Sequence, residues 1–302
     1  MPHWKLPNYS LIAACMVLLA LATPVWAANT APKPDEQLAA AITVGKAQWL
    51  EAGGERFLGI YTQATTATPL GAAIILPGLA IHPDWPDVVG PLRRGLPAYS
   101  WSTLSIQLPI PTKGDDKLWQ LEPYFTASHD RIQAAVAFLQ QQGINNIVLI
   151  GYGLGAAAAA VSVSDGNSLK VAAFAAISLG IPPRSAPSPY QAGLLEKIRV
   201  PMLDIYGSRD LDEVTKTAAA RLSAAQRGGF DASHNQQLDS LLHSAMARLP
   251  TTEQNGYIAY RQLVLTGADH RFRGAEATLL KRIAGWLRKH AGVTLPILTA
   301  GN

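Results

Sequence analysis

The sequence predicts an α/β protein, a three-layer sandwich in which helices cover both faces of a mostly parallel sheet. Short apolar strands alternate with helical segments from about residue 72 to the C-terminus, as in parallel strands joined by crossover helices. Strands such as "AAIILP" and "NIVLIG" are apolar along their whole length, which is typical of a sheet buried on both faces. Only the first two strands are expected to form an antiparallel hairpin, at one edge of the sheet.

The expected elements follow from this alternation. An amphipathic helix over 35–50 precedes the two hairpin strands, 57–63 and 72–77, which a short turn joins. The later strands are "STLSIQLP", "NIVLIG", "KVAAFAAIS", "PMLDIYG" and "YRQLVLTG", and the later helices are expected at 87–94, 124–142, 154 onward, 190–198, 212–226, 235–248 and 275–290. The segment 179–198 is too short for a large lid domain, so any lid is a Pro-rich loop.

The N-terminal residues 1–27 are predicted to be a secretory signal peptide, which leaves a single domain over 28–302. A polar lead with one cation is followed by an apolar run at 11–22 and by small residues ending at Ala27. The run is shorter than the roughly 20 residues that a membrane span needs. We therefore expect cleavage after Ala27, a periplasmic or secreted protein, and no membrane span in the mature chain. The alternative is a lipid anchor on Cys15, within "IAAC".

Composition narrows the function classes. Cys15 is the only cysteine, so the mature chain is expected to have no disulfide, thiol nucleophile or thiolate metal site. The net charge of +4 without a long charged run argues against nucleic acid as a partner. His82 and Asp84 lie close in sequence but lack the two further ligands of a typical metal site. We expect no metal and no cofactor, and a small molecule or a periplasmic protein as the partner.

The stretch "VLIGYGLGAA" has two interpretations. As a dinucleotide fingerprint, Gly151, Gly153 and Ala156 fit the glycine pattern between a strand and a helix. That site also needs an acidic residue about 20 positions further on, where "VAAFAAISLG" contains neither Asp nor Glu. A dinucleotide-binding oxidoreductase is thus the lesser alternative.

The second interpretation is a nucleophile elbow, the sharp strand-to-helix turn that carries a serine in many hydrolases. Gly153 stands where the nucleophile would be. In such enzymes an acid and then a histidine follow, each after a strand. Here Asp210 follows "MLDIYGSR" and His270 follows "LVLTGAD", with Asp212 as the alternative acid. In such a pair the carboxylate orients the imidazole, which leaves the other ring nitrogen free to act as a base.

The same edge of the sheet offers further binding groups. Backbone N–H groups at Gly78 to Leu79 and at Leu154 occupy the places that stabilise an oxyanion in this arrangement. The loop "IHPDWP" adds His82, Asp84 and Trp85, which either contact a ligand there or form a Pro-braced structural loop. Of the nearby serines Ser208, Ser178 and Ser128, none is expected on a strained turn beside His270.

These motifs together resemble the α/β-hydrolase superfamily over the whole mature chain. The stretches "LPGLAIHPDWPDVV", "IGYGLGAAAA", "DIYGSRD" and "GADHRFRG" most resemble an exported bacterial branch without an established substrate. The resemblance implies acid and base roles for Asp210 and His270, and a nucleophile position that holds Gly153. It predicts a non-catalytic or atypical hydrolase-like protein that binds a ligand or partner at the cleft. The alternative is an active ester or amide hydrolase that uses another nucleophile or a water activated by His270.

Overall fold

The structure is a computed structural model that describes residues 1–3, 34–114, 120–164, 169–180, 192–228 and 260–292. The expected signal peptide with Cys15, most of the Pro-rich loop and the helix expected at 235–248 lie outside the described residues. In the part of the chain that is described, no helix combines the length and the apolar character needed to cross a membrane.

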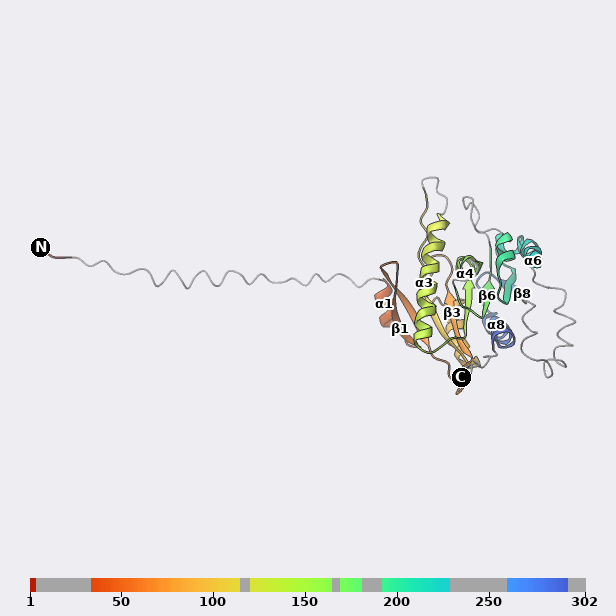
Figure 1. The fold of residues 1–302 in the computed structure, drawn as a ribbon, viewed down its shortest axis with the longest axis horizontal. Helices are drawn as coiled ribbons and strands as arrows, with labels where there is room; N and C mark the ends of the chain where they lie inside the picture. The colour runs from red at the N-terminus through yellow and green to blue at the C-terminus, as the bar shows by residue number, and fades with distance from the viewer. Residues whose placement is uncertain (4–33, 115–119, 165–168, 181–191, 229–259, 293–302) are drawn as a thin grey trace, which may run out of the picture.

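One eight-stranded sheet forms the centre of the molecule (Figure 1). Its strands stand in the order β1-β2-β4-β3-β5-β6-β7-β8, and neighbours from β4 to β8 are parallel. The strands are β1 (Lys46–Ala52), β2 (Glu55–Thr62), β3 (Gly71–Leu76), β4 (Trp101–Ile106), β5 (Ile147–Tyr152), β6 (Ala173–Ile177), β7 (Met202–Arg209) and β8 (Tyr260–Asp269). The prediction of a mostly parallel sheet with an antiparallel hairpin at its edge is confirmed.

The hairpin consists of other strands than the sequence suggested. β1 and β2 pair antiparallel across a turn at Gly53 and Gly54, and β2 then pairs antiparallel with β4. The predicted pairing of 57–63 with 72–77 is therefore wrong, as is the predicted helix over 35–50. Helix α1 (Pro34–Ala41) is short and is followed by β1. The half-exposed edge strand β1 carries good helix formers, and its two-glycine turn, a strong hairpin signal, decides the local structure.

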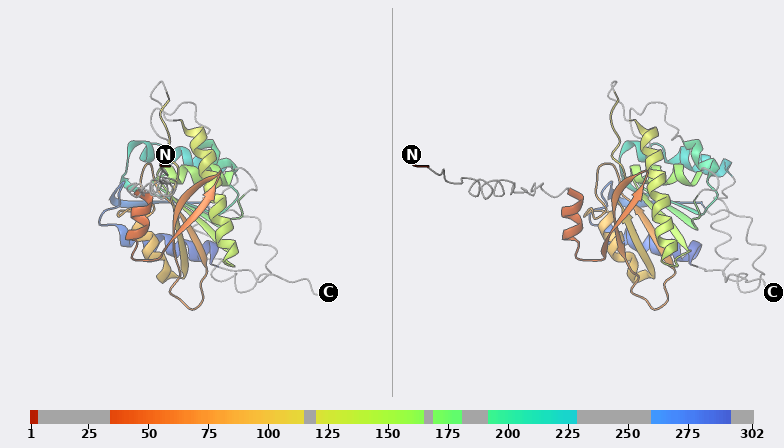
Figure 2. Two further views of the ribbon diagram at one scale, coloured as in Figure 1. Left: turned by 90° about the vertical axis from the view of Figure 1, so that its left-hand side faces the viewer. Right: turned by 60° about the vertical axis from the view of Figure 1, so that its left-hand side comes forward.

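Helices cover both faces of the sheet (Figures 1 and 2). One face packs on α3 (Leu121–Gln141), α4 (Leu154–Ser164), the 3₁₀ segment η2 (Ala192–Lys197) and α6 (Ala218–Arg227), and the other on α2 (Val89–Gly95), η1 (Leu96–Tyr99) and α8 (Glu276–Ala291). Successive residues of β3 alternate between the two layers: Ile74 joins the core under α3, and Ile75 joins the core under α8. This alternation explains why the central strands are apolar throughout.

Candidate functional site

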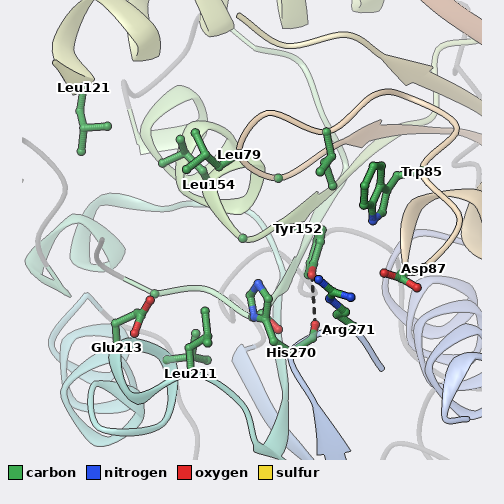
Figure 3. A pocket seen from close by; sticks show the side chains of 16 residues that line it. Leu79, Trp85, Asp87, Leu121, Tyr152, Leu154, Leu211, Glu213, His270 and Arg271 are labelled. Carbon is green, nitrogen blue, oxygen red and sulfur yellow. Dashed lines mark hydrogen bonds between the residues drawn. The ribbon is translucent and has the colours of Figure 1, made fainter. Parts of the chain in front are cut away.

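A cavity of about 360 Å³ lies where the parallel strands end, the edge at which open α/β sheets bind ligands. The loops after β3, β5, β6, β7 and β8 all contribute to it (Figure 3). Its walls are mostly apolar and include five ionisable side chains. The lining residues are Gly78, Leu79, Ile81, Trp85, Asp87, Leu121, Tyr152, Gly153, Leu154, Ser178, Gly180, Leu211, Glu213, Val214, His270 and Arg271.

The glycine-rich turn between β5 and α4 has two kinds of glycine. A Cβ added at Gly151 would lie 2.4 Å from Ala156 Cα, and one at Gly155 would lie 2.3 Å from the Pro77 carbonyl oxygen. No side chain fits at either position, because α4 packs directly on the strand ends. Gly153 differs. Its φ is +54°, and within the part of the chain that the structure describes an added Cβ would contact only Gly78 Cα, at 3.9 Å, so there is room for a side chain on the pocket wall.

His270 and Asp210 form a hydrogen-bonded pair at the pocket. His270 Nδ1 lies 2.7 Å from Asp210 Oδ1, and the Asp210 side chain is fully buried while that of His270 is 30% exposed. A carboxylate can only accept hydrogen bonds, so Nδ1 carries the proton and Nε2 remains available to the pocket. The alternative acid is elsewhere: Asp212 is exposed at the start of α5 (Asp212–Thr215) and pairs with Lys216.

Asp210 is held from several directions. Ser178 donates from Oγ to Asp210 Oδ2 at 2.5 Å, and the Leu211 backbone N–H donates to Oδ1 at 2.8 Å. Burial by itself raises the pKa of Asp210, but the hydrogen bonds from His270, Ser178 and Leu211 outweigh it and hold that pKa below its ordinary value. Asp210 therefore remains a carboxylate that orients the imidazole.

Ser178 stands on a strained turn, which the sequence did not reveal. It follows β6 with a φ of +51°, is buried, and lines the pocket. The expectation that no nearby serine sits on such a turn is wrong for this residue. Its hydroxyl points to Asp210 instead of to Nε2 of His270, so the position supports the acid.

Tyr152 contacts the other side of His270. The two rings are 5.1 Å apart between centroids, and the tyrosine hydroxyl donates to the backbone carbonyl of His270 at 3.1 Å. Burial, and then the nearby charges of Asp210 and Asp87, raise the pKa of Tyr152. Tyr152 is consequently a neutral phenol. Its hydrogen bond to the His270 carbonyl, the dashed line in Figure 3, holds the loop after β8 that carries His270.

Two backbone N–H groups complete this part of the pocket. Leu79 follows β3 and Leu154 begins α4, and both line the cavity beside Gly153. Within the described residues neither N–H donates a hydrogen bond to the protein. Both are thus available to an acceptor in the pocket.

Comparison with known protein families shows which family the chain belongs to. The model of the family described as "Protein of unknown function (DUF3530)" matches residues 9–118 and 120–244. The chain belongs to this family. None of the curated proteins compared with it matches significantly.

Solved structures with the same architecture are α/β serine hydrolases. Est1E from Butyrivibrio proteoclasticus superposes with a TM-score of 0.57 at 11% identity, over 81% of this chain and 98% of Est1E. An α/β serine hydrolase homologue from Coxiella burnetii gives 0.52 at 16% identity, over 82% and 99% of the two chains. A lidless α/β serine hydrolase from Xanthomonas campestris gives 0.53 at 15% identity, over 84% and 98%. This DUF3530 chain therefore has the α/β-hydrolase fold, as the sequence predicted.

The loop "IHPDWP" contributes only partly to the pocket. Trp85 lines it, whereas His82 and Asp84 do not. Asp84 Oδ1 accepts hydrogen bonds from Arg93 and Arg94, and Asp84 N–H donates to His82 Nδ1. Arg93 is buried and needs a counter-charge, so Asp84 is tied to the packing of α2 and is not free for a ligand. The structural interpretation of this loop fits His82 and Asp84.

The pocket residues that sequence reasoning missed share a simple signal. Ser178 directly follows β6, Arg271 comes soon after β8, and Asp87 lies on the loop after β3. Proximity to the carboxyl end of a parallel strand would have singled out each of them. Among the described residues, no group of three or more His, Cys, Asp or Glu is placed to hold a metal ion.

Proposed function

We propose that this protein is an exported α/β-hydrolase-fold protein that binds a ligand or partner at its pocket without forming an acyl-enzyme. Gly153 carries the proposal. It sits on the strand-to-helix turn at the wall of the pocket that holds His270, and a glycine has no oxygen that could attack a carbonyl. Export rests on the sequence of residues 1–27, which has the composition of a signal peptide.

Ser178, which lines the pocket, does not replace the missing nucleophile. Ser178 donates to Asp210 Oδ2, so its proton is directed to the acid and not to the base. A nucleophilic serine needs its proton taken by the histidine. The glycine at position 153 has a physical benefit as well, since a φ of +54° is strained for other residues by about 1–3 kcal/mol.

A second candidate is supported by the intact pair. His270 is oriented by Asp210 and has Nε2 available, so it could activate a water molecule for the hydrolysis of an ester or amide. Enzymes that lose a triad member keep roughly a thousandfold acceleration over water. The second candidate therefore predicts slow turnover that depends on His270.

One experiment distinguishes the two. The wild-type protein, Gly153→Ser, and Gly153→Ser combined with His270→Ala are treated with a fluorophosphonate probe and with p-nitrophenyl esters. The proposal expects labelling of Gly153→Ser alone and no wild-type turnover, because the turn has room for a side chain. Gly53→Ser is the matched control, since Gly53, on the turn between β1 and β2, has a similar φ of +57° and no described atom within 4 Å of an added Cβ.

Two results would contradict the ligand-binding proposal, and each supports a different catalytic mechanism. Wild-type ester turnover that His270→Ala abolishes would overturn the ligand-binding proposal in favour of the water mechanism. Labelling of the wild type that Ser178→Ala abolishes would overturn it in favour of another nucleophile.

A further inference from the structure

The missing side chain at position 153 leaves open space beside groups that donate hydrogen bonds. Among the described residues, a Cβ there would have Gly78 Cα, at 3.9 Å, as its one neighbour within 4 Å. The N–H groups of Leu79 and Leu154 have no protein acceptor among the described residues and belong to the same wall. In Figure 3 the ring of His270 is directed toward the side of the pocket where Leu79 and Leu154 lie.

A carboxylate matches this set of donors. It presents two oxygens that only accept hydrogen bonds. One oxygen can accept from the backbone N–H groups, and the other from Nε2–H of a protonated His270, whose Nδ1–H is already given to Asp210. Hydrogen bonds to a charged acceptor are shorter and about twice as strong as neutral ones. With a serine at position 153, its hydroxyl would stand in the space that the carboxylate needs.

The apolar walls indicate what the carboxylate is attached to. In Figure 3 the side chains of four leucines lie on one side of His270, namely Leu79, Leu121, Leu154 and Leu211. Val214 also lines the pocket. Two of the leucines are unusually exposed, Leu79 at 41% and Leu211 at 44%. Exposed apolar side chains at the mouth of a pocket favour an apolar ligand that covers them.

The charges around His270 are compatible with an anion. Asp210 is paired with His270 itself, and Asp87 is paired with Arg273 at 3.1 Å. Arg271 lines the pocket, and its guanidinium has no hydrogen-bond acceptor within the described part of the chain. Glu213 lies beyond Leu211 as seen from His270 (Figure 3), on the side of the pocket where the apolar part of the ligand would lie. Asp269, on the histidine loop, accepts a hydrogen bond from the Arg271 backbone N–H.

We propose that the pocket binds an unesterified apolar carboxylic acid in its ionised form. The carboxylate occupies the space at Gly153, between the N–H of Leu154 and Nε2–H of His270, and the apolar chain lies along the leucines. This assignment rests on the proposed function, because it requires that position 153 hold no nucleophile. The site that stabilises an oxyanion in a hydrolase is here a site for a stable anion.

Isothermal titration calorimetry with decanoate and decanamide tests the assignment, since the amide has nearly the same shape and no charge. The wild-type protein is expected to bind decanoate at least about tenfold more tightly than decanamide, the size of one charge-assisted hydrogen bond. His270→Gln is expected to remove this preference. Gly153→Ser is expected to weaken decanoate binding about tenfold, whereas the control Gly53→Ser, which has a similar φ outside the pocket, leaves it unchanged.

Equal affinities for the two compounds, or no binding of either, would overturn the carboxylate assignment. Neither result touches the proposed absence of an acyl-enzyme, which the fluorophosphonate probe tests separately. Circular dichroism checks that each variant is folded. If His270→Gln does not fold, the comparison of decanoate with decanamide on the wild type decides alone.

Discussion

Two aspartates of β7 and its following turn are both fully buried, yet their surroundings differ. Asp204 lies within the strand, and Asp210 comes directly after it. Within the described residues, the Asp204 carboxylate accepts hydrogen bonds from two buried side chains, Arg221 Nε at 2.8 Å and Tyr260 Oη at 2.8 Å, and from the partly buried Gln262 Nε2 at 2.9 Å. This network is closed, because none of these four residues lines the pocket.

The network around Asp210 is open at one end. Ser178 and the Leu211 backbone hold the carboxylate, but its third partner, His270, is partly exposed and lines the pocket. Burial of a carboxylate therefore does not distinguish a functional residue from a structural one in this chain. The distinguishing feature is that the partner of Asp210 has a second polar atom left for a ligand.

The largest expected effect comes from breaking the closed network. Asp204→Ala leaves Arg221 buried, with a side chain only 3% exposed, and without its counter-charge. Removing one partner of a buried pair costs about 3–5 kcal/mol, so we expect the free energy of unfolding in urea to fall by that amount. The control is Asp212→Ala, which breaks an exposed pair with Lys216 and is expected to have no measurable effect. Equal losses in the two variants would contradict the structural role of Asp204.

A smaller, pH-dependent effect is expected at the open network. The pKa of Asp210 is held below its ordinary value, so its stabilising contribution is complete above the unfolded-state value of about 4 and is lost as the pH falls through the folded-state value. We expect Asp210→Asn to lower the unfolding free energy at pH 7 by about 1–3 kcal/mol. The difference from the wild type should shrink at pH 3, as measured by urea denaturation. A difference that is the same at both pH values would show that the charge of Asp210 does not matter for stability.

The fold was largely predictable because strand and helix patterns are local. Parallel strands buried on both faces are apolar along their length, as β3 and β5 are, and the order of the elements then fixes which loops meet. The edge was less predictable. β1 is only partly buried and its residues also suit a helix, so its pairing with β2 depends on the Gly53–Gly54 turn and on contacts across the sheet.

The site was predictable where position alone decides. Asp210 and His270 follow neighbouring strands, so the topology brings them together. Side-chain direction was not predictable. Nothing in the sequence indicates that Tyr152 lies against His270, or that Asp84 pairs with Arg93, which comes from the next helix. Such pairings depend on three-dimensional packing that no spacing in the sequence records.

The last comparison removes one hydroxyl from each network, and its effect at Ser178 is the smallest expected. Tyr260→Phe removes a donor to Asp204, and Ser178→Ala removes a donor to Asp210. Tyr260→Phe removes two hydrogen bonds, the one that the hydroxyl donates to Asp204 Oδ2 and the one that it accepts from Gln262 Nε2 at 3.2 Å, so we expect a cost of about 1.5–3 kcal/mol. In the open network Asp210 Oδ2 keeps the Gly207 N–H at 3.3 Å, and alanine retains the Cβ at the strained φ, so about 1 kcal/mol is expected.

Ser178→Ala should also raise the pKa of Asp210, because it removes one of the hydrogen bonds that lower it. The loss of stability in acid would then begin at a higher pH than in the wild type. Urea denaturation of both variants between pH 3 and pH 7 measures these effects. Equal costs at pH 7, with no displacement of the acid profile, would mean that both aspartates belong to structural networks of the same kind.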